Sequence, residues 1–144
     1  MANIIPDSFK SELLSGTHNF ATGGNTFKLA LYVTTLGPPY TTSSTVYSTD
    51  NEVSSSGTGY TTGGNALDSQ AVSIPGSNTA VVDFANEVFS DVTLTSLGAA
   101  IYNVTNGNKL CLVLDFGGNK VATSGDFTIQ FPAATAGAAI IRVA

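Results

Sequence analysis

The residues of this 144-residue chain best suited to nucleophilic or acid–base chemistry are its single histidine, His18, and its single cysteine, Cys111. A Cys–His pair can act as a covalent-catalysis centre if the thiolate is accessible. Cys111 lies within the apolar run at residues 110–114, so we expect a buried, inert thiol with no internal disulfide partner. His18 has no Cys, His or clustered carboxylates at metal-ligand spacing, so we expect a capping or packing role for it.

Carboxylates in the second half of the chain are the next candidates, because a pair of acids can hydrolyse a glycosidic bond. They are Asp83, Glu87, Asp91, Asp115 and Asp126. Asp83 and Asp115 each precede a phenylalanine at the end of an expected strand. Acids in that position commonly cap turns or face solvent, so we expect a structural role for them.

Three short segments resemble ligand or modification motifs only in part. Residues 57–64 read Gly-Thr-Gly-Tyr-Thr-Thr-Gly-Gly, but they lack the Lys-Ser/Thr of a phosphate-binding loop and no helical pattern follows. Residues 50–52, Asp-Asn-Glu, lack the spacing of a calcium loop. Residues 103–105 form a glycosylation sequon without a secretory signal ahead of it. We therefore predict no catalytic residue, no cofactor, no metal and no enzymatic activity.

The composition limits the classes of partner. Charged residues make up 10% of the chain, against about 25% in ordinary soluble domains. The net charge is −5, which disfavours binding to nucleic acid or to an anionic membrane surface. No apolar run approaches the length of a membrane span. We therefore expect neither nucleic acid nor membrane as a partner.

The central element is a predicted hairpin at residues 97–118, with Asn106-Gly107 as a tight two-residue turn. Four apolar side chains of its second arm alternate onto one face: Leu110, Leu112, Leu114 and Phe116. Cys111 and Val113 on the other face are apolar too. A strand that is apolar on both sides is covered on both sides, either by a second sheet or by another subunit.

The rest of the chain predicts one all-β domain, residues 1–144, built as a β-sandwich or jelly roll with one short N-terminal helix. The helix is expected at residues 7–14 and is ended by Gly16. Short strands are expected at residues 27–33, 71–74, 79–84, 88–95 and 125–132. The apolar segment 138–144 must pair in a sheet or be buried against a neighbour.

A long Thr/Ser/Gly/Tyr-rich loop at residues 34–65 is the main candidate for a partner-binding surface. Apolar residues near both termini extend the expected interface. Its proposed members are Ile4, Ile5, Phe9, Leu13, Leu14, Tyr40, Tyr47, Tyr60, Ile140, Ile141 and Val143.

The chain resembles a family of small virion proteins of tailed bacteriophages along nearly its whole length. The resemblance lies in Asp7-Ser8-Phe9-Lys10, Glu12-Leu13-Leu14, Gly16, His18, Phe20, Phe27-Lys28, Ala30-Leu31-Tyr32, Tyr47, Glu52-Val53, residues 57–61, Gly63-Gly64, residues 114–117, residues 125–132 and Ile140-Ile141-Arg142. Many members look like capsid decoration, or cement, proteins that sit on the shell in symmetric clusters, often trimers. No family catalytic residue exists to carry over.

The resemblance implies a non-enzymatic virion structural protein that stabilises the head by bridging capsomers. Its expected partners are copies of itself, as a trimer, and the major capsid protein. Its expected location is the capsid surface, after synthesis in the host cytoplasm and release by lysis. The alternative is a tail, fibre or receptor-binding component of the same kind of particle.

Overall fold

The computed structural model describes residues 3–34, 40–76 and 78–144, and within them it has one helix, α1 (Asp7–Leu14), and seven strands. The strands are β1 (Phe27–Tyr32), β2 (Asn65–Ala66), β3 (Ala71–Gly76), β4 (Thr79–Asp83), β5 (Glu87–Asn103), β6 (Lys109–Ile129) and β7 (Ile141–Val143). They form two antiparallel sheets, ordered β2-β1-β5-β6 and β3-β4-β7. The predicted all-β fold with one short N-terminal helix is confirmed.

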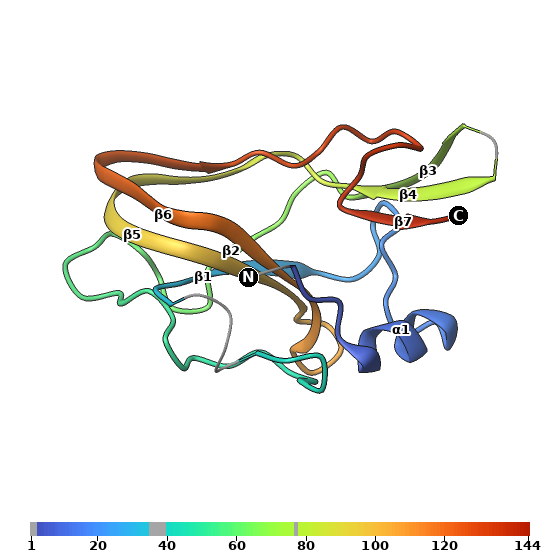
Figure 1. Cartoon of the computed structure of the whole chain (residues 1–144), viewed down its shortest axis with the longest axis horizontal. Helices are drawn as coiled ribbons and strands as arrows, with labels where there is room; N and C mark the ends of the chain where they lie inside the picture. The colour runs from blue at the N-terminus through green and yellow to red at the C-terminus, as the bar shows by residue number, and fades with distance from the viewer. Residues whose placement is uncertain (1–2, 35–39, 77) are drawn as a thin grey trace.

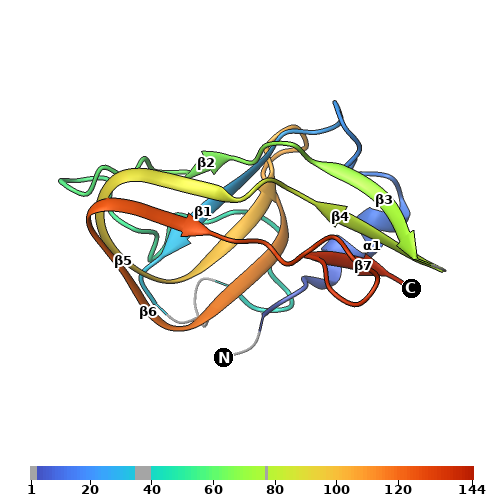
Figure 2. The ribbon, with the colours of Figure 1, turned by 90° about the horizontal axis from the view of Figure 1, so that it is seen from above.

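Strands β5 and β6 form one long hairpin that dominates the molecule (Figure 1). The strands expected at residues 88–95 and 125–132 are not separate elements, because β5 and β6 run on for 17 and 21 residues. We call residues 87–96 and 120–129 the outer half of the hairpin, and the part next to the turn the inner half. Figures 1 and 2 show the outer half folded back over the inner half, so one hairpin contributes to both layers.

A large bulge produces this fold-over. Ser96 pairs with Lys120 and Gly98 pairs with Asp115, so one residue of β5 lies opposite four residues of β6. Extra residues on one strand bend it and increase its twist while the ladder resumes on the other side. The sequence pattern predicted a separate strand on each side of this point, whereas the structure has one continuous strand that bends.

A second, smaller bulge changes which side chains share a face. The register shifts where Ile101 pairs with Leu112 but Tyr102 pairs with Leu110, which leaves Cys111 as the extra residue. Cys111 and Leu112 consequently both belong to the core between the layers, whereas Leu110 belongs to the opposite face. The strict alternation predicted for this arm is therefore wrong at two residues, Leu110 and Cys111, each of which lies on the face opposite to the expected one.

The turn of the hairpin is also longer than predicted. Residues 104–108 form the connection, and the left-handed positions are Gly107 (φ 70°) and Asn108 (φ 58°). The backbone N–H of Asn106 donates to Oδ1 of Asn103 at 3.3 Å, which draws Asn106 back toward the strand end. The expected two-residue Asn106-Gly107 turn is therefore wrong.

The space between the layers is filled by phenylalanine rings and aliphatic side chains. Phe20 and Phe27 stack with ring centroids 4.3 Å apart, and Phe84 meets both rings edge-on. In the outer half of the hairpin, Phe89 pairs with Phe127 and both are buried. These rings join α1, both sheets and the hairpin into one core.

The opposite face of the inner half is covered by the chain's own segment 40–64. Tyr47 stacks on Tyr102 with ring centroids 4.4 Å apart, and Tyr40 meets Tyr32 edge-on at 5.2 Å. These residues form a second buried cluster with Leu110 and its neighbours. Both faces of the apolar hairpin are therefore covered within one subunit.

Helix α1 ends as predicted at Gly16, which has the left-handed conformation (φ 77°) of a helix C-terminal cap. The backbone N–H of Thr17 donates to the carbonyl of Glu12 at 2.9 Å, which completes this cap. Phe9 is the buried residue of the helix. A two-turn helix is marginal alone, so its position depends on this docking.

Both ends of the described chain join sheets. Ile4 donates its N–H to the carbonyl of Val113 at 2.8 Å and accepts from the N–H of Val113 at 2.9 Å. At the other end, β7 pairs with β4. The expected sheet pairing of the apolar C-terminal segment is thus confirmed. None of the described helices has the length and apolar character needed to cross a bilayer.

We predict that Gly64→Ala destabilises the protein far more than Gly16→Ala. Both glycines have left-handed φ angles, 72° and 77°, but only at Gly64 would a Cβ collide with backbone, 1.8 Å from the carbonyl oxygen of Leu29. Gly16→Ala should cost about 1 kcal/mol of unfolding free energy for its backbone conformation. Gly64→Ala should cost roughly 3 kcal/mol or more, because strand β1 must move. Urea unfolding of both variants measures the difference, and equal losses would contradict the packing described here.

Candidate functional site: a buried Cys–His–Glu cluster and an apolar groove

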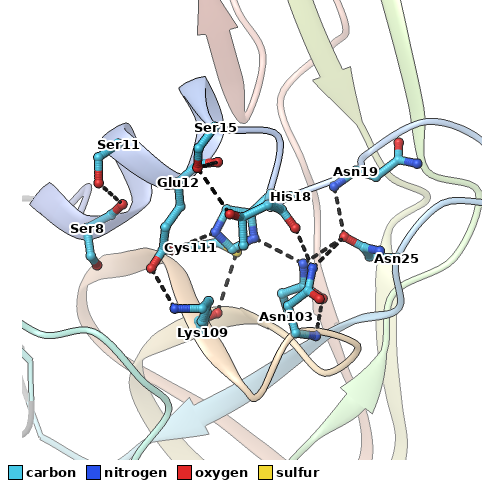
Figure 3. Close-up of polar contacts among 12 residues, drawn as sticks. Ser8, Ser11, Glu12, Ser15, His18, Asn19, Asn25, Asn103, Lys109 and Cys111 are labelled. Carbon is cyan, nitrogen blue, oxygen red and sulfur yellow. Dashed lines mark hydrogen bonds and ion pairs between the residues drawn. The ribbon is translucent and has the colours of Figure 1, made fainter.

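The fold brings the only cysteine and the only histidine together with a carboxylate (Figure 3). His18, on the connection after α1, lies with Nδ1 3.7 Å from Sγ of Cys111 on β6. Its Nε2 lies 2.8 Å from Oε2 of Glu12 on α1. These are the residue types of a Cys–His–Glu triad, so the cluster requires a test as a catalytic centre.

The hydrogen bonds around His18 assign a role to each of its ring nitrogens. The side-chain amide Nδ2 of Asn103 donates to His18 Nδ1 at 3.0 Å and to Oδ1 of Asn25 at 2.9 Å. Asn103 Oδ1 accepts from the backbone of Asn106, which fixes the orientation of the amide. His18 Nδ1 is therefore an acceptor, and Nε2–H donates to Glu12.

This arrangement does not make Cys111 a nucleophile. Its side chain is completely buried, and burial raises the pKa of the thiol, with the Glu12 charge adding to the effect. The Nδ1 lone pair that would remove the thiol proton already accepts from Asn103. The cluster is a structural one, as the sequence predicted for Cys111, and it also joins α1 to the hairpin.

Glu12 is the charged residue at the centre of this contact between α1 and the hairpin. It accepts hydrogen bonds from His18 and, through Oε1 at 3.0 Å, from the Lys109 ammonium. Burial acts to raise the pKa of this carboxyl, but the hydrogen bonds from His18 and Lys109 outweigh it and hold the pKa below its ordinary value. The ion pair between Glu12 and Lys109 links α1 to the start of β6.

The glycine-rich segment 57–64 donates hydrogen bonds to the carboxylate of Glu52. The N–H of Gly63 donates to Oε1 of Glu52 at 2.6 Å. The hydroxyls of Tyr47 and Tyr60 donate to the two oxygens of the same carboxylate, at 2.5 and 2.6 Å. Glu52 therefore anchors the segment that covers the hairpin, a role that no local pattern around this residue indicates.

Asp115 and Glu87 each bond to another part of the chain. Asp115 Oδ1 accepts from the N–H of Gly117 at 2.8 Å, which confirms a turn-capping role and lowers the pKa of this carboxyl. Glu87 is buried and accepts from the Asn65 amide at 2.8 Å. Among the described residues, no three His, Cys, Asp or Glu side chains gather closely enough to hold a metal ion.

Several residues predicted to form an interface lie inside the subunit. Phe9, Tyr40 and Tyr60 are 1–3% exposed, so they cannot contact a partner. The tyrosines were predicted to face outward because of their polar tips, but Tyr60 donates to Glu52 and Tyr40 bonds the Tyr32 hydroxyl at 2.6 Å. The described part of the loop 34–65 is thus a cover for the sheet, and residues 35–39 of it lie outside the described residues.

The other predicted interface residues retain some exposure. Ile5, Leu14 and Val143 are exposed, and Leu14 is 91% exposed at the end of α1. The partly buried members are Ile4, Leu13, Tyr47, Ile140 and Ile141.

An apolar groove of about 460 Å³ lies between α1 and the β3-β4-β7 sheet, and Figure 1 shows the helix beneath that sheet. Its lining includes Leu13, Phe20, Val72, Val82, Ile141 and Val143. Val72, Val82 and Ile141 are in register across the three strands, so they share the face that points toward the groove. No charged residue is among the described residues that line it.

Comparison with known proteins found no matching family model, no matching curated protein and no matching solved structure.

We predict that Glu12→Gln lowers the unfolding free energy by roughly 1–3 kcal/mol at pH 7, because it removes two charge-assisted hydrogen bonds. The folded pKa of Glu12 lies below its ordinary value of 4.5, so its charge stabilises the fold above that pH. The contribution disappears as the pH falls through the folded pKa, and the two proteins should then converge. Urea unfolding at neutral and acidic pH measures this.

The control for Glu12→Gln is Asp7→Asn, which removes an exposed ion pair with Lys10. An exposed pair contributes less than about 1 kcal/mol, so this variant should stay close to the parent protein. An unchanged loss for Glu12→Gln in acid would show that its charge is not what stabilises the joint.

We predict that Cys111 does not react with a thiol reagent in the native protein and reacts once per chain in denaturant. The reason is that the side chain is fully buried and burial raises the pKa of the thiol. Absorbance on addition of an aromatic disulfide reagent measures the reaction. Rapid native labelling would mean that the cluster opens to solvent.

Proposed function

We propose that this chain is a non-enzymatic structural protein of a bacteriophage particle, and specifically a capsid decoration protein that works as an oligomer. The single observation that carries the proposal is the apolar groove between α1 and the β3-β4-β7 sheet. Leu14, which follows the lining residue Leu13 in the sequence, is exposed. Large exposed apolar features on a folded subunit mark interaction sites.

The character of this groove supports a permanent protein contact. Obligate interfaces resemble a domain core cut in two, and they are more apolar than transient ones. The groove is lined by side chains that continue the core, such as Phe20 and Val82, and its rim carries Val72 and Val143, each about half exposed. A second copy of the chain, whose surface has few charges, can cover such a face without burying an unpaired ion.

The proposed role places the oligomer on the capsid shell, with the major capsid protein as its second partner. Resistance to the internal pressure of a filled head requires large neutral contacts that bridge capsomers. The low proportion of charged residues, 10%, supports contacts of this kind. A tail or receptor-binding position is the alternative, and copy number separates the two.

We predict that the purified protein is an oligomer, with a trimer expected, and that Leu14→Glu or Val143→Glu converts it to a monomer. Each substitution would bury a carboxylate without a partner in the interface, at a cost of several kcal/mol. Native mass spectrometry gives the oligomeric state, and thermal unfolding checks that the subunit stays folded. The matched control is Val88→Glu, on the exposed face of β5 away from the groove, which should remain oligomeric.

Cryo-electron microscopy of the particle tests the location. We expect many copies on the shell at the symmetric positions between capsomers. A monomeric protein present in a few copies, or density confined to the tail, would overturn the decoration role.

A further inference from the structure

A second concave feature lies along β6, and it differs in chemistry from the apolar groove. This side pocket, of about 370 Å³, lies beside the bend of the hairpin. Its apolar floor includes Phe116 and Phe127, whose ring centroids are 6.1 Å apart and tilted by 44°. Its rim carries Lys120, Asp126 and Gln130.

The bend explains why these side chains converge. Phe116 belongs to the four extra residues of β6, and so it leaves the regular ladder and is half-buried instead of being enclosed in the core. Bulges commonly re-aim a side chain in this way beside binding sites. The outer half of β6 then brings Asp126, Phe127 and Gln130 to the same pocket.

The polar groups of the rim are available to a ligand. Within the described residues, the side chains of Lys120 and Gln130 have no hydrogen-bond or ion-pair partner. Asp126 accepts a single long hydrogen bond, 3.4 Å from the N–H of Asp91. An ammonium donor, a carboxylate acceptor and an amide that can do both therefore surround an aromatic floor.

The aromatic floor and the polar rim of the side pocket favour some classes of ligand over others. The charges of Lys120 and Asp126 leave the pocket without the net positive charge that a phosphate group requires, and a purely apolar ligand would remove the polar groups of the rim from water without replacing their hydrogen bonds. A pyranose ring has one apolar C–H face that packs on a phenyl ring, and its hydroxyls both donate and accept. The opposite charges of Lys120 and Asp126 cancel, so the pocket suits a neutral sugar.

We propose that the side pocket between the bend of the hairpin and the outer half of β6 is a binding site for a neutral oligosaccharide. Phe116 provides the surface on which the sugar ring packs, and Lys120, Asp126 and Gln130 bond its hydroxyls. This site is independent of the oligomer contact at the apolar groove, so either proposal can fail without the other.

The test is a titration of the isotopically labelled full chain, followed by NMR, with three named probes: a glucose hexasaccharide, an N-acetylglucosamine tetrasaccharide and adenosine monophosphate. We expect at least one of the two saccharides to shift amide signals within residues 116–130, with millimolar or tighter affinity. Adenosine monophosphate should not, because the pocket has no net positive charge to hold its phosphate. Failure of both saccharides to shift these signals, shifts located elsewhere, or binding of the nucleotide alone would each overturn the proposal.

Variants then test the assigned residues. Lys120→Ala and Gln130→Ala should each weaken saccharide binding at least about fivefold, as expected for lost hydrogen bonds to a bound ligand. Phe116→Leu keeps apolar volume but removes the flat ring, and it should weaken binding by a similar factor. The control Lys10→Ala removes an exposed lysine from α1 and should bind as the parent does. Unchanged affinity in all three pocket variants would contradict the assignment.

Discussion

The inner half of the β5–β6 hairpin has apolar side chains on both faces, and the rest of the fold follows from the need to keep both faces from water. Burial of apolar surface is the dominant favourable term in folding, so a two-sided apolar strand requires a cover on each side. The hairpin provides one cover by folding its own outer half back across the bulge between Ser96 and Lys120. The segment 40–64 provides the other. The layered architecture thus buries the apolar side chains on both faces of the inner half of the hairpin.

Two partly buried carboxylates, each with hydrogen bonds to both of its oxygens, hold segments of the chain on the hairpin. Glu52 accepts from two tyrosine hydroxyls and one backbone amide, which holds the segment 40–64 on the sheet. Glu12 accepts from His18 and Lys109, which holds α1 and the following connection on the hairpin. Hydrogen bonds to a partly buried carboxylate are charge-assisted, so each one fixes the position of the segment that carries the carboxylate. The chain has few charged residues, and these two acids orient both α1 and the segment 40–64 on the hairpin.

The remaining surface divides into two regions of different character. The groove beneath the β3-β4-β7 sheet is apolar and suits a protein surface, whereas the side pocket on β6 combines aromatic rings with polar groups and suits a small hydrated ligand. The two lie on different elements, so an oligomer formed through the groove leaves the pocket accessible. The two proposals assign the groove to an oligomer contact and the side pocket to sugar binding.

The sequence by itself determined the local features: the helix at residues 7–14 with its Gly16 end, the all-β class, the central hairpin and the inert Cys111. These depend on alternation, on glycine conformation and on apolar runs, which are properties of neighbouring residues. Only the tertiary structure decided that the hairpin bends, that Phe9, Tyr40 and Tyr60 are buried, and that His18 meets Cys111 and Glu12. These features arise between residues far apart in the chain, where one bulge changes the face of every residue beyond it, and no local pattern records that shift.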